Sequence, residues 1–284
     1  MNDIETFLLE LADLSKGLAL FHRTSILENK TIEKKADDTI VTEADKSISI
    51  ILQNKINEFM STNGVSDFVI IDEEYTSGTK ESDFDKSRYA WIIDPIDGTL
   101  NYACGLNSYA ISIALLEDGE PCAAIVILPS RHEIYMSVDG RFRYINYIDS
   151  ITRQEPYKHP AVTEEIKDNF YIFGSNYFVS NNRLKRGVIM TTRSSVVNGV
   201  STIDGSVAAS IERVCIWDNA AIFVLAEAAG LKMYNYETGE EIEKLTSDLF
   251  TSTDTKKWFW NFTTMIVRPD MKESVENLIL KDKA

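Results

Sequence analysis

Residues 91–99 read Trp-Ile-Ile-Asp-Pro-Ile-Asp-Gly-Thr, an apolar run that stops at two carboxylates. The run begins at residue 89, is short and rich in aromatic and β-branched residues, and lacks a helical period, which predicts a buried strand. Pro95 fixes φ between the two carboxylates, and Gly98 lets the backbone turn tightly and approach a ligand closely. Carboxylates, a hydroxyl and free backbone N–H groups at one strand end are what a Mg²⁺–phosphate site requires.

Two further acidic segments accompany this stretch. Residues 68–71 predict a second short buried strand, and it stops at Asp72, Glu73 and Glu74, which alone would be a solvated charge run. Asp218 lies in the first turn of a predicted helix over 217–229 that stops at Gly230, a position where carboxylates are favoured and commonly serve as caps. Residues 91–99 could likewise be no more than an Asp-rich turn. A carboxylate at the end of a buried strand needs a partner, however, which favours a ligand site.

The surrounding sequence predicts a run of strands followed by alternating strands and helices. Helical spacing of apolar residues indicates one helix over 4–28 and another beginning at residues 42–45. Asp-Gly pairs at 118–119 and 139–140 separate strand-like runs over 109–145 and predict hairpins. Later strand-like runs alternate with helical ones; the strands cover 170–173, 188–191 and 262–267, and the last helix covers 270–281. This order predicts an α/β (α+β) sandwich of two sheets with helix layers.

The composition excludes several classes of function. Among 284 residues, 44 are acidic and 29 basic, so the net charge is −15. Such a surface repels phosphate backbones and anionic lipids, which argues against nucleic-acid and membrane partners. The three cysteines form no C-x-x-C pair and the three histidines are scattered, so the cysteines predict reduced thiols in the cytoplasm and a thiolate or histidine metal site has little support. The N-terminus is acidic and amphipathic and does not resemble a signal peptide.

A polar stretch over 148–168 contains Pro156 and Pro160 and predicts a junction between two parts of one catalytic unit. The first part, 1–147, would be an α+β subdomain that carries most of the metal ligands. The second part, 148–284, would be an α/β subdomain that supplies Asp218 and the region determining substrate specificity.

Four ordered motifs make the sequence similar to a known family. They are Trp91–Tyr102, which continues the stretch above with Leu-Asn-Tyr; Trp217-Asp218-Asn219-Ala220-Ala221 followed by Glu227-Ala228-Ala229-Gly230; Val41-Thr42-Glu43-Ala44-Asp45; and Asp72-Glu73-Glu74. With these motifs, over nearly its whole length, the chain resembles the inositol monophosphatase-like family of Mg²⁺-dependent, lithium-sensitive sugar and nucleotide phosphatases. The resemblance implies a layered αβαβα sandwich of the inositol monophosphatase/fructose-1,6-bisphosphatase type, and we expect a cytoplasmic homodimer.

The resemblance also implies a role for each matching residue. Two to three Mg²⁺ ions would be bound in the site: the first by Glu73, Asp94 and the carbonyl of Ile96, the second by Asp94, Asp97 and Asp218, and a third, weaker one near Glu73. Thr99 and Asp45 would polarise the attacking water, and the N–H groups of Gly98 and Thr99 would hold the phosphate. Glu212 stands near the position of a residue that binds a substrate hydroxyl; the alternative is a solvated surface glutamate.

The implied reaction is Mg²⁺-dependent hydrolysis of a small polyol or sugar phosphate, first of all inositol 1-phosphate, by direct in-line attack of metal-activated water. Residues 100–102 are typical of the inositol-phosphatase branch. Two regions depart from the family: residues 193–210 lack the usual Arg-x-x-Gly-Ser/Thr-Ala-Ala-Leu pattern, and the hairpin at 139–142 lacks a Gly-rich run. A 3′(2′),5′-bisphosphate nucleotidase or a fructose-1,6-bisphosphatase is the alternative within the family, and a non-catalytic regulatory homologue is a more remote one.

Overall fold

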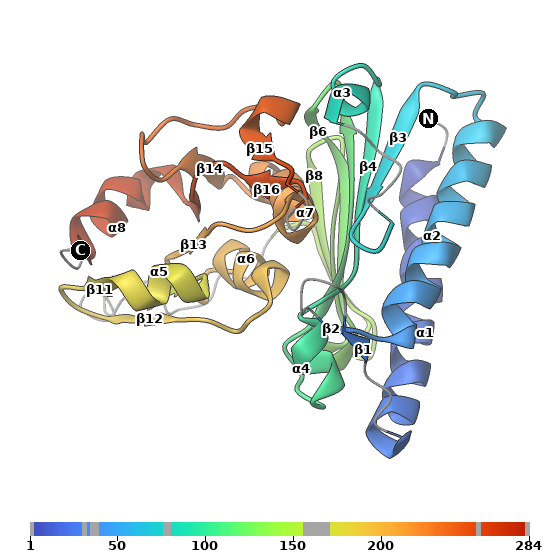
Figure 1. Cartoon of the computed structure of the whole chain (residues 1–284), viewed down its shortest axis with the longest axis horizontal. Coiled ribbons are helices and arrows are strands. Elements are labelled where there is room, and N and C mark those ends of the chain that lie inside the picture. The colour runs from blue at the N-terminus through green and yellow to red at the C-terminus, as the bar shows by residue number, and fades with distance from the viewer. Residues whose placement is uncertain are drawn as a thin grey trace.

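The computed structural model describes residues 3–29, 33–34, 40–75, 81–155, 171–253 and 257–281. Five layers follow one another across the molecule (Figure 1): two long helices, a seven-stranded sheet, a second pair of helices, a five-stranded sheet and a last pair of short helices. This arrangement confirms the αβαβα sandwich expected from the sequence.

The outer helix layer consists of α1 (Ile4–Asn29) and α2 (Glu43–Thr62), which lie side by side on one face of the seven-stranded sheet (Figure 1). Helix α2 begins with a capping box, in which the Thr42 hydroxyl accepts from the Ala44 N–H and the Asp45 carboxylate accepts from the Thr42 N–H. This cap satisfies backbone donors that the first turn of a helix leaves unpaired.

The seven-stranded sheet has the order β3-β4-β5-β6-β7-β8-β9. Its strands are β3 (Phe68–Asp72), β4 (Tyr89–Asp97), β5 (Ala110–Glu117), β6 (Glu120–Leu128), β7 (Glu133–Val138), β8 (Arg141–Asn146) and β9 (Ile151–Arg153). Strands β3 and β4 pair in parallel, and the other neighbours pair antiparallel. The hairpins predicted at Asp118-Gly119 and Asp139-Gly140 are confirmed: all four residues have positive φ, as two-residue type I′ turns require.

Both faces of this sheet are buried over most of β4 to β7, and these strands are apolar on both sides. In β4, Trp91 and Ile93 belong to the core shared with α1 and α2, whereas Ala90 and Ile92 belong to the core shared with α7 (Ile216–Ala228). The period-2 alternation of side chains thus divides one strand between two cores.

The middle layer is formed by α6 (Ser195–Ile203) and α7, which contact each other closely. A Cβ on Gly199 would lie 2.5 Å from Cγ2 of Ile222, so this helix contact needs a glycine. The five-stranded sheet beyond has the order β12-β10-β13-β17-β14, with strands β10 (Tyr171–Gly174), β12 (Val188–Met190), β13 (Ala209–Glu212), β14 (Lys232–Asn235) and β17 (Thr264–Val267). Its other face packs against α5 (Asn176–Asn181) and α8 (Lys272–Leu278).

The remaining elements are short. They are β1 (Glu33–Lys34) with β2 (Ile40–Val41), α3 (Glu81–Phe84), α4 (Thr99–Ala103), β11 (Asn182–Leu184), β15 (Phe250–Thr251), β16 (Phe259–Trp260), β18 (Ile279–Lys281), and single turns at Pro129–Arg131, Ser247–Leu249 and Pro269–Met271.

The prediction of a single helix over 270–281 is wrong. Helix α8 ends at Leu278, and residues 279–281 form β18, which pairs antiparallel with β11. The pairing partner of β18 lies nearly a hundred residues earlier in the chain. The local spacing of apolar residues therefore cannot predict this strand.

The predicted junction at 148–168 lies partly outside the described residues. Up to Arg153 the chain still belongs to the first sheet, because β9 pairs with β8. The large core around α7 contains residues from both sides of this stretch, from Ile71 to Ile266. The division into 1–147 and 148–284 stays a prediction.

Among the described residues, no helix combines the length and the hydropathy needed to cross a membrane.

Candidate active site

An irregularity at the end of β4 brings the first two carboxylates to one face of the sheet. Opposite β5, Asp94 pairs with Ser112 and Asp97 with Ala110, so three steps along β4 match two along β5. This is a β-bulge at Pro95-Ile96, a place where proline is tolerated because the ladder is already interrupted. In a regular strand, residues three apart face opposite ways. With the extra residue, Ile96 packs toward α1 and α2, and Asp97 joins Asp94 on the other face.

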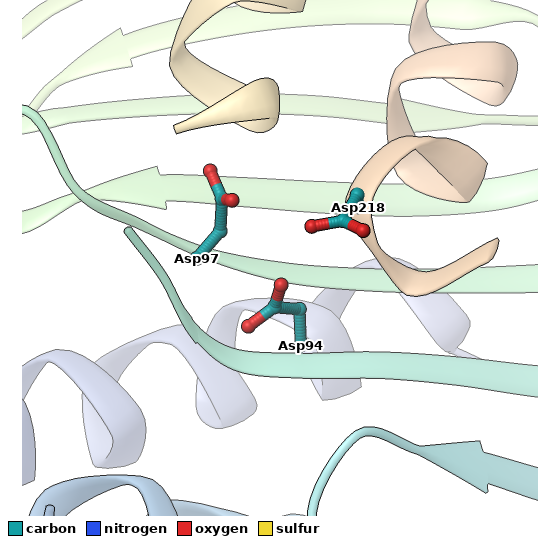
Figure 2. Close-up of side chains that lie close together, drawn as sticks. All are labelled: Asp94, Asp97 and Asp218. Atoms are coloured by element: carbon teal, nitrogen blue, oxygen red, sulfur yellow. The ribbon is translucent and has the colours of Figure 1, made fainter. Parts of the chain in front are cut away.

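The third carboxylate comes from the start of α7. One ligand atom each of Asp94, Asp97 and Asp218 can be chosen so that all three lie within 4.8 Å of one another. Figure 2 shows the carboxyl groups of the two β4 residues facing that of Asp218 on the first turn of the helix. Oδ2 of Asp218 accepts from the Cys215 N–H at 2.7 Å, so this residue is also the helix cap that its sequence position suggested.

Asp94 lies at the centre of the site and is the residue that demands a ligand. Its side chain is 1% exposed, and neither carboxylate oxygen has a hydrogen-bond partner. Burial, and then the charges of Glu73, Asp97 and Asp218, hold its pKa well above the ordinary value. Buried polar atoms are nearly always paired, so two orphaned oxygens on one buried carboxylate indicate a cation.

Asp97 has several partners of its own at the N-terminus of α6. It accepts from the Ser194 hydroxyl, from the Ser195 N–H at 3.2 Å and from the Val196 N–H at 2.9 Å. Burial raises the pKa of Asp97 to about 7 although these hydrogen bonds oppose the shift. Ser194 was not predicted from the sequence as a partner of Asp97. Two serines before an apolar run are a helix-start signal, but nothing local links them to a carboxylate nearly a hundred residues earlier.

Asp45 and Thr99 meet as the resemblance implied. Oδ1 of Asp45 accepts from the Thr99 hydroxyl at 3.3 Å, and that hydroxyl also lies 3.0 Å from the Ile96 carbonyl oxygen. The other oxygen of Asp45 accepts from the N–H and the hydroxyl of Thr42, which holds the buried carboxylate in place.

Gly98 precedes α4 with a φ of 84°, a conformation that favours glycine. A Cβ there would lie 2.9 Å from the Ser108 carbonyl oxygen and 3.1 Å from Cβ of Ser194. Both the backbone conformation and the close packing therefore require glycine at this turn.

Glu73 lies beside Asp94 because β3 and β4 run parallel. Asp72 pairs with Ile93, and the Glu73 N–H donates to the Ile93 carbonyl at 3.2 Å. The Glu73 charge raises the pKa of both Asp94 and Asp218. The buried Asp72 carboxylate accepts from Ser49 at 2.7 Å, from Gln53 at 3.0 Å and from the Glu74 N–H at 2.8 Å.

These bonds tie the end of β3 to α2, the helix that carries Asp45. The sequence alone placed Asp72 only within a charge run and did not predict this role.

Glu212 is buried, which excludes the solvated surface glutamate considered above. It lies on β13 and accepts from Nδ2 of Asn198 on α6 at 2.6 Å. Burial raises the pKa of Glu212 to about 7, although hydrogen bonds from Asn198 and Ser195 oppose the shift. The Glu212 charge in turn raises the pKa of Asp97 and of Asp218. Asn198, which the sequence analysis did not single out, in turn accepts from the Thr192 hydroxyl at 2.7 Å.

The donor set fits a hard divalent cation. All converging side-chain ligands are carboxylates, the ligand class that Mg²⁺ and Ca²⁺ prefer, and the central one has no protein partner. Within the described part of the chain, this is the one group of three or more His, Cys, Asp or Glu side chains that converges in this way.

A model of the inositol monophosphatase family matches residues 2–260. The chain belongs to the inositol monophosphatase family. Members of this family are phosphatases that hydrolyse phosphomonoesters, and the chain is one of them. A fructose-1,6-bisphosphatase/inositol-1-monophosphatase of Aquifex aeolicus is 26% identical over 232 residues, covering 78% of this chain and 82% of that protein. A histidinol-phosphatase of Chlorobaculum parvum is 26% identical over 243 residues, covering 82% and 86%.

Solved structures of the family share the fold. An IMPase of Thermotoga maritima is similar with a TM-score of 0.71 at 21% identity, over 97% of this chain and 96% of that one. An IMPase/NADP phosphatase in complex with Mg²⁺ and phosphate has a TM-score of 0.64 at 20% identity, over 95% of both chains.

Proposed function

We propose that this family member is a Mg²⁺-dependent phosphomonoesterase that hydrolyses a small polyol or sugar phosphate, with inositol 1-phosphate as the first candidate. The observation that carries the metal dependence is Asp94: a buried carboxylate with two unpartnered oxygens, surrounded by other carboxylates. An IMPase/NADP phosphatase with the same fold has been solved in complex with Mg²⁺ and phosphate, which supports this proposal.

The residues divide between two principal ions. Glu73, Asp94 and the Ile96 carbonyl would hold one, and Asp94, Asp97 and Asp218 the other, with a third ion near Glu73. When bound, Mg²⁺ would offset charge on the phosphoryl oxygens and make a water molecule easier to deprotonate. The hydrogen bonds that Asp97 and Asp218 already accept fix their carboxylates in place, so the binding geometry would be formed before an ion arrives.

Other residues would act on the water and on the phosphate. The Thr99 hydroxyl, next to Oδ1 of Asp45, would accept a hydrogen bond from the water and pass its own hydrogen toward that carboxylate. The N–H groups of Gly98 and Thr99 at the start of α4 would hold the phosphate oxygens.

We expect activity to require Mg²⁺. Protein stripped with EDTA should lose turnover, and added Mg²⁺ should restore it, because the carboxylates alone repel a phosphate dianion. Lithium at high Mg²⁺ should lower turnover. Phosphate release measured in metal-free buffer, and after Mg²⁺ is added back, is the test; full activity of the metal-free protein would contradict the assignment.

The substrate proposal depends on Glu212, whose buried carboxylate would accept a hydrogen bond from a substrate hydroxyl. A comparison of kcat/KM for inositol 1-phosphate, fructose 1,6-bisphosphate, histidinol phosphate and adenosine 3′,5′-bisphosphate should rank inositol 1-phosphate first. Glu212→Gln should raise KM for the preferred polyol phosphate by about tenfold, since the substrate hydroxyl would then donate to a neutral amide oxygen instead of a carboxylate. The same variant should leave p-nitrophenyl phosphate, which has no such hydroxyl, nearly unchanged.

A higher kcat/KM for adenosine bisphosphate or fructose bisphosphate would favour the corresponding phosphatase instead. Absence of Mg²⁺-dependent turnover on all substrates would favour a non-catalytic homologue. The homodimer and the cytoplasmic location stay predictions.

A further inference from the structure

A cavity of about 450 Å³ lies away from the carboxylate cluster, at the far end of α7. Its lining comes from the last turns of α7, the start of β6, the end of β7 with its hairpin, and residues in and after β14. The polar and charged side chains in this lining are Glu120, Ser137, Glu227, Lys232 and Glu243. Helix α7 thus carries Asp218 on its first turn and Glu227 close to its last.

Two buried polar atoms in this lining have no partner. The Ser137 side chain is 1% exposed, and its hydroxyl makes no hydrogen bond, because its neighbours across the sheet are Ala124 and Phe142. Oε1 of Glu227 is also buried and unpaired, although Oε2 binds Lys232 Nζ at 2.9 Å. A carboxylate oxygen needs a donor and a serine hydroxyl can accept one, so the missing group is a hydrogen-bond donor.

The charge of the cavity selects a cation. The charged residues that line the cavity are three acids, Glu120, Glu227 and Glu243, and one base, Lys232. The Lys232 ammonium already forms ion pairs with Glu227 and, at 2.8 Å, with Glu241. Glu120 and Glu243 are exposed at the rim, and neither makes an ion pair within the described part of the chain. The C-terminal end of α7, where the helix dipole is negative, adds to the attraction.

The size and spacing of the lining argue against a metal ion. A cavity of this volume matches a small organic ligand rather than an ion. In the described chain, the cavity's carboxylates do not form a three-ligand group of the kind found around Asp94.

We propose that this cavity binds a small organic diamine in its charged form. One ammonium would donate to Oε1 of Glu227 and the Ser137 hydroxyl at the bottom of the cavity. The other would lie between Glu120 and Glu243 at the rim. The site is independent of the proposed function, since none of these residues belongs to the carboxylate cluster.

The test is calorimetric titration with 1,4-diaminobutane, at low ionic strength and in excess Mg²⁺ so that the Asp94 cluster does not compete for the amine. We expect saturable binding of one molecule per chain and none of 1,4-butanediol, the neutral analogue. Glu227→Gln should weaken binding at least about tenfold and Ser137→Ala about fivefold. Glu58→Gln, which removes an exposed charge on α2 across the sheet, should leave it unchanged.

Ser137→Ala keeps the proposal testable if Glu227→Gln fails to fold, because removing an unpaired buried hydroxyl should not destabilise the protein. Asp94→Asn should bind the diamine as well as the unmodified protein does. Absence of saturable binding, equal binding of the diol, unchanged affinity in both cavity variants, or loss of binding in Asp94→Asn would each overturn the proposal.

Discussion

Asp94→Asn should abolish turnover while leaving the metal-free protein as stable as before or more stable. The side chain would contact both principal ions, so removing its charge weakens both sites together. A loss of about a thousandfold in kcat is expected, because metal ions contribute several kcal/mol of transition-state stabilisation. In the metal-free protein, by contrast, Asp94 is buried among like charges with no hydrogen bond to lose. Neutralising it removes repulsion and leaves the protein unharmed.

The two properties are measured on one sample, as kcat with saturating Mg²⁺ and as the melting temperature in EDTA. Asp218→Ala is the informative comparison, because Asp218 also accepts from the Cys215 N–H at the start of α7, and loss of that acceptor should lower the melting temperature as well. An Asp94→Asn protein that melts earlier yet keeps near-normal turnover would show that Asp94 stabilises the fold rather than binding metal, and would overturn the metal assignment.

The metal-free protein should lose stability as the pH rises from about 5 to about 8. Burial raises the pKa of Asp97 and of Glu212 to about 7, and burial together with neighbouring carboxylates also holds the pKa values of Asp94 and Asp218 well above the ordinary value. A carboxyl whose pKa is higher in the folded state than in the unfolded state favours folding while it is protonated. Its contribution is complete below the unfolded pKa, about 4, and disappears as the pH rises through the folded value.

One pKa unit corresponds to about 1.4 kcal/mol, so the summed effect should lower the melting temperature on the order of 10 °C. Thermal melts in EDTA across this pH range measure it. Asp97→Asn and Glu212→Gln should each flatten the dependence, whereas Glu58→Gln should not. Saturating Mg²⁺ should cancel or reverse the slope, because ligands bind metal when deprotonated. A metal-free protein whose melting temperature rises steadily from pH 5 to 8 would contradict the assigned cluster.

The elements around the site could be predicted because their signals are local. The apolar run before Asp94, the Asp-Gly turns and the stop of α7 at Gly230 each lie within a few residues of the structure they determine. The failure at 270–281 has the opposite cause, since β18 exists because a distant strand pairs with it.

The convergence of the site residues could be expected only from the resemblance to a family. The bulge that turns Asp97 toward Asp94 depends on the register with β5, and the bonds from Ser194 to Asp97 and from Asn198 to Glu212 join separate parts of the chain. Apolar period, turn residues and capping patterns describe neighbours in sequence. They contain no information on which distant segment meets which, so the roles of these residues stay proposals.

The order in which the carboxylates occur along the chain has a consequence for synthesis on the ribosome. Asp45, Glu73, Asp94 and Asp97 all lie within the first hundred residues, but Asp218 arrives only with α7. At 5–20 residues per second, roughly 6–24 s separate the translation of Asp97 from that of Asp218. During that interval the nascent chain carries the acidic end of β4 without the helix that closes the cluster. A chain released before α7 therefore lacks Asp218 and cannot complete the carboxylate cluster.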